Sequence, residues 1–267
     1  MSNEEGVSPG WRNASIALVA YCVVLSLVSN GVFGRGIGDV SCSYTQRFSP
    51  SGPAFGIWVP IYLLSGLVIF EKLRYAQAES GEIENGQLVV VQNAFHSMSW
   101  LCAAGWTPAF TAGTGTGMLI AAILLCLTAA FALAAVFSEN RWGWSSWVTA
   151  AAYSSLAGWT TVAAAINVAI AYQANYGKPN ASCSRYPDDY NIFSPIEAKY
   201  ETVVPLILAS AVAVVAASLS EPVLGMPVAW AVYFMRPSYY NYAAFAISLI
   251  GVAVAIARTL YSASVFE

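Results

Sequence analysis

Polar and aromatic side chains recur at helical spacing inside three of the most apolar stretches of the chain. Asn93, His96, Ser97 and Trp100 follow one another at i, i+3, i+4 and i+7, so they lie on one face of a helix. Two other apolar stretches carry similar faces. Their residues are Phe55, Trp58, Tyr62 and Ser65 in the first, and Ser155, Trp159, Thr160, Ala163 and Asn167 in the second. Aromatic walls with a few polar anchors are the usual lining of a small-molecule pocket.

Two interpretations of these faces stay open. Asn and Ser side chains also hydrogen-bond neighbouring helices inside membranes, which stabilises a bundle by about 1 kcal/mol or less per contact. This packing role is favoured for the Asn and Ser residues. Trp usually lies at the membrane interface, yet Trp58, Trp100 and Trp159 fall inside their stretches, where each indole N–H needs a partner. For these three tryptophans, ligand contact and packing are equally supported.

His96 is the only histidine of the chain, and no cluster of cysteines and histidines accompanies it to complete a metal site. It could hold the metal of a tetrapyrrole as a single ligand, although a hydrogen-bonded residue of a helix bundle is the commoner role. The sequence has no Gly-x-Ser-x-Gly elbow for a nucleophile, and the apolar stretches hold no paired carboxylates. We therefore expect no catalytic residues, no dedicated metal site and no enzymatic activity.

Membrane-spanning helices must position these faces. Hydrophobic residues make up 58% of the chain and charged residues 9%, against roughly a quarter charged in soluble domains. The apolar blocks approach the ~20 residues that a spanning helix needs. Eight spans are predicted, at residues 14–34, 54–72, 88–110, 117–137, 147–172, 202–219, 223–235 and 242–261. The seventh is short and bracketed by Pro222 and Pro237, which indicates a tilted or re-entrant piece, and Pro60 predicts a kink in the second.

Two long connections, at residues 35–53 and 174–200, fall on the same side of the membrane in this topology. Cys42 and Cys183 lie in them, so they could form a disulfide if that side is oxidising; two free thiols are the alternative. Lysine and arginine are divided almost evenly between the two sides, so the positive-inside rule does not decide the orientation. The net charge of −3 and the lack of a basic tract give no sign of a nucleic-acid partner.

The segment at residues 48–62 resembles the signature of the TspO/translocator-protein family, also called tryptophan-rich sensory proteins. It reads Phe-Ser-Pro-Ser-Gly-Pro-Ala-Phe-Gly-Ile-Trp-Val-Pro-Ile-Tyr, a proline-containing approach followed by Phe-x-x-Trp and a Tyr four residues on. Residues 93–106 resemble the third-span pattern of the family, with Asn and Trp on one helix. Residues 147–167 resemble its fifth-span pattern, in which a Trp precedes an Ala-rich turn and an Asn. The resemblance covers roughly residues 14–172.

This resemblance implies an all-α integral membrane protein with a TspO-like five-helix bundle at residues 1–173. A loop at 174–200 and about three additional transmembrane helices at 201–267 follow, as in longer family members. The implied ligand is hydrophobic, either a tetrapyrrole of the porphyrin or chlorophyll type or a sterol. The candidate ligand-binding residues, from the faces and the resemblance together, are Trp58, Tyr62, Asn93, His96, Trp100, Trp159 and Asn167. Val168, Tyr172 and Lys178 also satisfy a loose pattern proposed for sterol contact.

The preferred function is the binding or sensing of such a ligand, with the lipid bilayer and a hydrophobic small molecule as partners. An organellar membrane is favoured over the plasma membrane, and a homodimer is one assembly considered. One alternative is a structural accessory subunit of a larger organellar membrane complex, whose partners would be the other subunits. The other alternative is a transporter of small hydrophobic molecules, although the spans carry few ionisable residues and show no clear inverted repeat.

Overall fold

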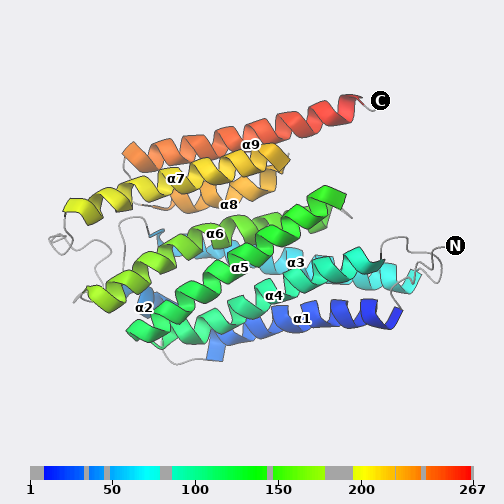
Figure 1. Cartoon of the computed structure of the whole chain (residues 1–267), viewed down its shortest axis with the longest axis horizontal. Coiled ribbons are helices and arrows are strands. Elements are labelled where there is room, and N and C mark those ends of the chain that lie inside the picture. Colours follow the sequence, from blue (N-terminus) through cyan, green and yellow to red (C-terminus); the bar gives the residue numbers. More distant parts are fainter. Residues whose placement is uncertain are drawn as a thin grey trace.

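The computed structural model describes residues 9–32, 36–44, 49–78, 86–142, 147–177, 195–219, 221–235 and 239–265. These residues form nine α-helices and one 3-10 helix, with no β-strand among them. In chain order the elements are α1 (Pro9–Val32), α2 (Ile37–Ser43), η1 (Gly52–Ile57), α3 (Trp58–Ala78), α4 (Gly86–Thr111), α5 (Gly115–Trp142), α6 (Trp147–Tyr176), α7 (Pro195–Leu219), α8 (Pro222–Tyr233) and α9 (Tyr239–Val265). The long helices lie side by side along the length of the molecule (Figure 1).

Each of the eight predicted spans contains a helix, namely α1 and α3 to α9, so the prediction of an all-α membrane protein is confirmed. The short helix α2, in the first long connection, was not predicted. The backbone N–H of Gly36 donates a hydrogen bond to Asp39 Oδ2 at 3.3 Å at the start of this helix, and Val40 is buried. A local cap and one buried side chain thus stabilise α2. The helix is too short to be recognised from the hydropathy of the sequence.

Pro60 lies in the first turn of α3 rather than in the interior of a helix. The 3-10 helix η1 ends at Ile57 and α3 begins at Trp58. A proline in the first helical turn removes no obligatory hydrogen bond, because the N–H groups there have no partner within the α-helix. Pro60 therefore lies next to the junction between the 3-10 helix and α3, where the polar and aromatic face of α3 begins.

The long helices of the first two thirds of the chain close into a ring of five. α1 packs against α3 and α4, α5 packs against α4 and α6, and α3 packs against α6. Among the described residues, α3 and α4 make no extensive backbone contact with each other, so they face one another across the interior of the ring. Large side chains occupy this interior, and Trp100, Trp159, Tyr153 and His96 are among the largest fully buried ones.

The last three helices form a second group, which packs on the ring mainly through α8 against α6 (Figure 1). Gly158 of α6 permits this approach, because a Cβ atom there would overlap the backbone oxygen of Leu224 in α8. The far end of α8 reaches η1, where the indole N–H of Trp230 donates to the carbonyl oxygen of Ala54 at 2.9 Å. The second group therefore supports the segment that carries the start of the aromatic face.

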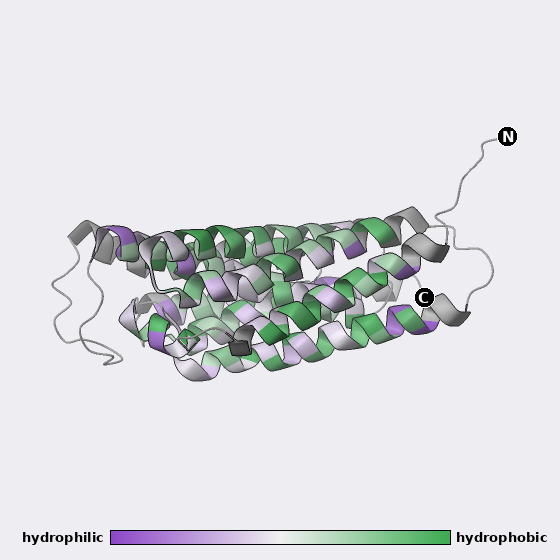
Figure 2. Cartoon of the chain, turned by 90° about the horizontal axis from the view of Figure 1, so that it is seen from below, coloured by the Kyte–Doolittle hydropathy of each residue, from purple (hydrophilic) through white to green (hydrophobic). Residues whose placement is uncertain are grey.

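Four of the described helical stretches are long and apolar enough to cross a membrane: Gly52–Arg74, Gly115–Ser138, Trp147–Tyr176 and Asn241–Tyr261. α4 is long enough but less apolar, because Asn93, His96 and two serines lie on it. α8 has 12 residues, a length of about 18 Å, which is too short for the ~30 Å of hydrocarbon. Hydrophobic residues cover the length of the bundle, and hydrophilic residues gather toward its ends (Figure 2).

The two long connections are described only in part. Helix α6 continues to Tyr176 and α7 begins at Pro195, so the second connection is shorter than the predicted loop at residues 174–200. Cys42, in the first connection, is disulfide-bonded. Its predicted partner, Cys183, lies outside the described residues, so the pairing stays a prediction. The three cysteines of the spans are free: Cys22, Cys102 and Cys126.

Candidate functional site

Five aromatic side chains from η1, α3, α4 and α6 form one group in the ring, which we call the aromatic cluster. Its members are Phe55, Trp58, Tyr62, Trp100 and Trp159. The ring centroid of Trp58 lies 6.4 Å from both Trp100 and Trp159 and 5.8 Å from Tyr62. Tyr62 and Trp100 are 5.0 Å apart. These separations are within the range in which aromatic rings attract one another directly, so the helical faces meet through their rings.

The aromatic cluster is closed on one side and partly open on the other. Trp100 and Trp159 are only 0% and 1% exposed, whereas Phe55 is 37% exposed and Trp58 and Tyr62 are half-buried. The open side therefore belongs to η1 and the beginning of α3, next to the first long connection. A flat apolar molecule that approaches from this side meets Trp58 and Tyr62 first.

One polar group of the aromatic cluster is satisfied and another is not. The hydroxyl groups of Tyr62 and Ser26 share a hydrogen bond of 3.0 Å, which ties α3 to α1. The indole N–H of Trp159 is buried and has no hydrogen-bond partner. Buried polar groups in native proteins are nearly always paired, so an unpaired donor calls for a ligand or a water molecule.

His96 extends the aromatic cluster toward the other end of the ring. Its Nε2 atom accepts a hydrogen bond from the indole N–H of Trp100 at 2.9 Å, and its ring lies 4.4 Å from that of Tyr153. A nitrogen that accepts carries no proton, so the proton of the neutral imidazole belongs on Nδ1, which is buried without a partner. Ligation of a tetrapyrrole metal by His96 would therefore break the bond to Trp100 or shift the proton from Nδ1.

A second group of polar side chains, which we call the polar cluster, joins four helices beyond His96. Its members are Ser15 of α1, Lys72 of α3, Asn93 of α4 and Tyr153 of α6. The ammonium group of Lys72 donates to Asn93 Oδ1 at 2.6 Å and to the hydroxyl of Tyr153 at 2.9 Å. The amide nitrogen of Asn93 donates to Ser15 Oγ at 2.9 Å. Asn93 thus contributes to this cluster and not to the aromatic one.

Asn167 lies apart from both clusters. Its side-chain oxygen accepts a hydrogen bond from the indole N–H of Trp106 at 2.9 Å, and its nitrogen donates to the carbonyl of Ala163 at 2.9 Å. Trp106 stacks at 5.2 Å on Phe110 of the same helix. The amide oxygen thus joins α6 to α4, and the amide nitrogen is engaged within α6. Because both polar atoms have partners, the geometry favours a packing role for this predicted ligand residue.

Replacing Asn167 by alanine should destabilise the protein by about 1 kcal/mol, because the buried indole N–H of Trp106 loses its acceptor. Ligand affinity should stay unchanged. Urea titration in mild detergent, followed by circular dichroism, measures the first effect, and quenching of tryptophan fluorescence by a bound ligand measures the second. A loss of ligand affinity with unchanged stability would contradict the packing role and show that Asn167 contacts the ligand.

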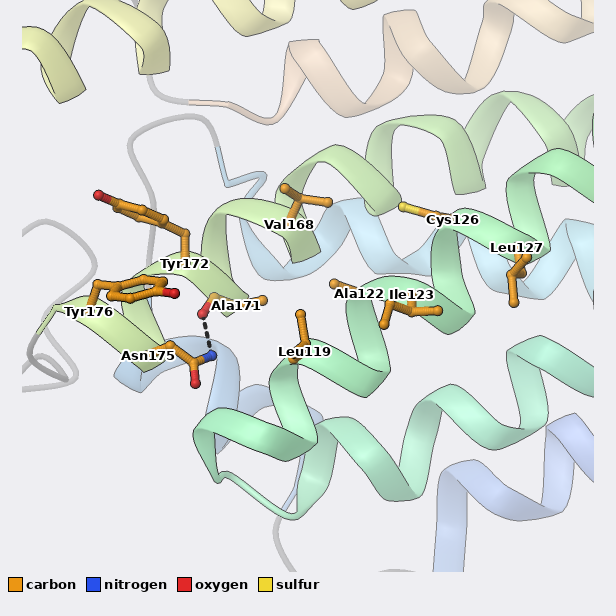
Figure 3. A pocket seen from close by; sticks show the side chains of 10 residues that line it. All are labelled: Leu119, Ala122, Ile123, Cys126, Leu127, Val168, Ala171, Tyr172, Asn175 and Tyr176. Atoms are coloured by element: carbon orange, nitrogen blue, oxygen red, sulfur yellow. Dashed lines mark hydrogen bonds between the residues drawn. The ribbon is translucent and has the colours of Figure 1, made fainter.

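A groove on the outer surface between α5 and α6 is a separate feature, with a volume of about 460 Å³. Its lining is mostly apolar and consists of Leu119, Ala122, Ile123, Cys126, Leu127, Val168, Ala171, Tyr172, Asn175 and Tyr176 (Figure 3). The rings of Tyr172 and Tyr176 lie 5.2 Å apart at one end. Val168 and Tyr172 belong to the predicted sterol-contact pattern, whereas its third residue, Lys178, lies outside the described residues.

Ser15, Lys72 and Tyr153 are the residues of the polar cluster that the sequence analysis did not name. Lys72 follows Trp58 and Ser65 at intervals of seven residues, so it continues the same face of α3. The predicted span 54–72 ends at Lys72, so the residue was taken as the end of the span and not as part of its polar face. Tyr153 lies two residues before Ser155, where the predicted face of α6 begins. The heptad spacing on α3 was the signal that could have identified Lys72.

Fold and site together define a multi-pass helical membrane protein whose ring of helices encloses an aromatic and polar interior. The family model for TSPO-like proteins matches residues 12–262. The chain therefore belongs to the TSPO-like protein family. The match continues beyond the five-helix ring into α9, while the division into domains at residues 173 and 201 stays a prediction. No curated protein and no solved structure matches the chain.

Proposed function

We propose that the protein binds a hydrophobic ligand at the aromatic cluster and acts by binding or sensing it, without catalysing a reaction. The observation that carries the proposal is the convergence of Phe55, Trp58, Tyr62, Trp100 and Trp159 from four elements on one partly open place. Aromatic faces with few polar groups suit a flat apolar molecule. Membership in the TSPO-like family supports membrane ligand binding in general.

The unpaired indole N–H of Trp159 favours a ligand that offers a hydrogen-bond acceptor. A tetrapyrrole offers the tilted and edge-on rings of the aromatic cluster a flat conjugated face, which the puckered ring system of a sterol lacks. The groove between α5 and α6 offers a sterol an apolar wall with tyrosines at one end. We therefore assign the tetrapyrrole class to the aromatic cluster.

Replacing Trp58 by alanine should weaken the binding of a porphyrin about tenfold, which corresponds to the loss of one aromatic contact of roughly 1.4 kcal/mol. Trp58 is half-buried, so the ring of helices should stay folded. Titration of the purified protein with protoporphyrin IX dimethyl ester, followed by quenching of tryptophan fluorescence, measures the affinity. The matched control is Trp147→Ala, because Trp147 is 75% exposed at the start of α6. Equal affinities in both variants would refute the proposed site.

A second experiment identifies the natural ligand. The protein is extracted from its own membrane in mild detergent and examined by absorption spectroscopy and mass spectrometry. A tetrapyrrole that co-purifies with this chain alone would support the proposal. Stoichiometric protein partners and no bound ligand would instead favour the accessory-subunit hypothesis, in which the fold serves assembly.

A further inference from the structure

The end of α8 meets η1 beside the open side of the aromatic cluster. We propose that this junction transmits the binding of a ligand from the aromatic cluster to the second group of helices, with Trp230 as the positioning residue that couples the two. Ligand binding then changes the last turn of α8 and its contact with α9. The inference rests on the proposed function, because it describes how a bound ligand affects the rest of the protein.

Two hydrogen bonds join the end of α8 to the backbone of η1 and of the residue before it. The indole N–H of Trp230 donates to the carbonyl oxygen of Ala54 at 2.9 Å. The backbone N–H of Ser51 donates to the carbonyl oxygen of Phe234 at 2.9 Å. The rings of Trp230 and Phe234 lie 4.8 Å apart, which orients the indole toward its acceptor. The segment that carries η1 is therefore attached to α8 at both Ser51 and Ala54.

Within the described part of the chain, η1 receives little support from other elements. Its extensive contacts are with α3, which continues it, and with α8. A Cβ atom at Gly52 or Gly56 would meet nothing within 4 Å, so the segment borders open space before and after Ala54. Phe55 comes directly after Ala54, and its ring centroid lies 5.9 Å from that of Trp159. The position of Phe55, and with it the open side of the aromatic cluster, therefore depends on α8.

The structure of α8 allows its last turn to move separately from its beginning. Near its start, α8 approaches α6 so closely that a Cβ atom at Gly158 would overlap the backbone oxygen of Leu224. Pro227 follows inside the helix, and a proline cannot donate the helical hydrogen bond to the residue four positions before it. Trp230 and Phe234 lie beyond this missing bond. A displacement of η1 can therefore shift the last turn of α8 while the contact with α6 stays intact.

The last turn of α8 also contacts α9. The ring centroid of Tyr233 lies 5.1 Å from that of Phe234 and 5.9 Å from that of Phe245 in α9. A ligand that favours one position of Phe55 thus favours one arrangement of η1, of the last turn of α8 and of its contact with α9. Such a coupling is reciprocal, because an arrangement of α8 that favours this position of Phe55 also strengthens ligand binding.

A purely structural role is the competing explanation, because the same two hydrogen bonds would hold η1 in place with or without a ligand. In that case the loss of the Trp230 N–H loosens η1, but ligand binding has no effect on the last turn of α8. The two explanations therefore differ in the response of α8 to a ligand, which can be measured separately from stability.

The test measures amide hydrogen–deuterium exchange of the full chain in phosphatidylcholine nanodiscs, with and without protoporphyrin IX dimethyl ester. Without the ester, Trp230→Phe should exchange its η1 amides about fivefold faster than wild type, because one hydrogen bond is lost while an aromatic ring is kept. In wild-type protein the ester should slow exchange in η1 and at residues 230–235. In Trp230→Phe it should slow exchange in η1 alone. Trp147→Phe, at a position 75% exposed, is the matched control and should behave as wild type.

If the bound ester slows exchange in wild-type η1 but not at residues 230–235, the inference fails while the proposed function stays intact. Equal exchange of η1 in ligand-free wild type and Trp230→Phe would overturn it too, because Trp230 then does not hold η1. The same holds if the response of residues 230–235 persists in full in Trp230→Phe, or if this variant exchanges faster in the distant helix α5 as well, which indicates a general loss of stability. Absence of ester binding to wild-type protein would overturn both proposals.

Discussion

Replacing Trp100 by alanine should lower the free energy of unfolding by about 3 kcal/mol or more and abolish porphyrin binding. Trp100 is fully buried and contacts Trp58, Tyr62 and His96. Its removal leaves a cavity between α3 and α4, and the lining loses dispersion contacts that no lipid can replace. His96 also loses the donor to Nε2, so both of its ring nitrogens become unpaired.

Urea titration in mild detergent, followed by circular dichroism, measures the change in stability, and fluorescence quenching measures binding. Trp100→Phe separates packing from hydrogen bonding, because it keeps an aromatic ring but removes the N–H. We expect this variant to lose about 1–2 kcal/mol and to retain measurable binding. Trp147→Ala, at an exposed position, should stay within about 0.5 kcal/mol of wild type. A stable Trp100→Ala variant with normal affinity would show that the aromatic cluster is neither core nor site.

Replacing Gly158 by alanine should weaken the contact between the five-helix ring and the last three helices. A Cβ atom at this position would overlap the backbone oxygen of Leu224 and lie 3.3 Å from Pro227 Cδ. Backbone atoms cannot move aside as a flexible side chain can, so α8 must shift away from α6. Overpacking of this kind costs about 1–3 kcal/mol, and the shift should also loosen the hydrogen bond from Trp230 to Ala54 beside the aromatic cluster.

The matched control is Gly66→Ala, because a Cβ atom at Gly66 of α3 would meet nothing within 4 Å. Alanine is the better helix former by about 0.5–1 kcal/mol, so this variant should be as stable as wild type or slightly more so. Stability is read from urea titrations, and accessibility of the α7–α8 connection from limited proteolysis. If both alanine variants behave alike, the close approach of α6 and α8 does not contribute to stability.

The predicted faces were correct for some residues and incomplete for others, for one physical reason. Helical periodicity shows which side chains share a face of one helix, and so it identified Trp58 with Tyr62 and His96 with Trp100. It does not show which helix that face meets. Asn167 lies on the same predicted face of α6 as Trp159. Its side chain nevertheless pairs with Trp106 of α4 and lies outside the aromatic cluster.

Local chemistry explains the remaining differences. The helix α2 is held by a cap at Asp39 and by burial of Val40, neither of which produces a long apolar run. Lys72 is the last residue of the predicted span 54–72 and therefore looked like a residue of the span's end, outside its polar face. In the structure its long side chain reaches into the bundle to Asn93 and Tyr153. A long flexible side chain can direct its charge toward a partner several ångströms away. The prediction of spans from hydropathy takes no account of this reach.

The sequence by itself determined the class of this protein. Backbone groups in lipid must pair within their own segment, so long apolar runs with few charges could only become a bundle of membrane helices. Only the tertiary structure decided the order of the helices in the ring and the rotation of each about its axis. The order and the rotation of the helices bring Ser15, Lys72, Asn93 and Tyr153 together. Both depend on how side chains of neighbouring helices pack, and the hydropathy of a single segment carries no information about that packing.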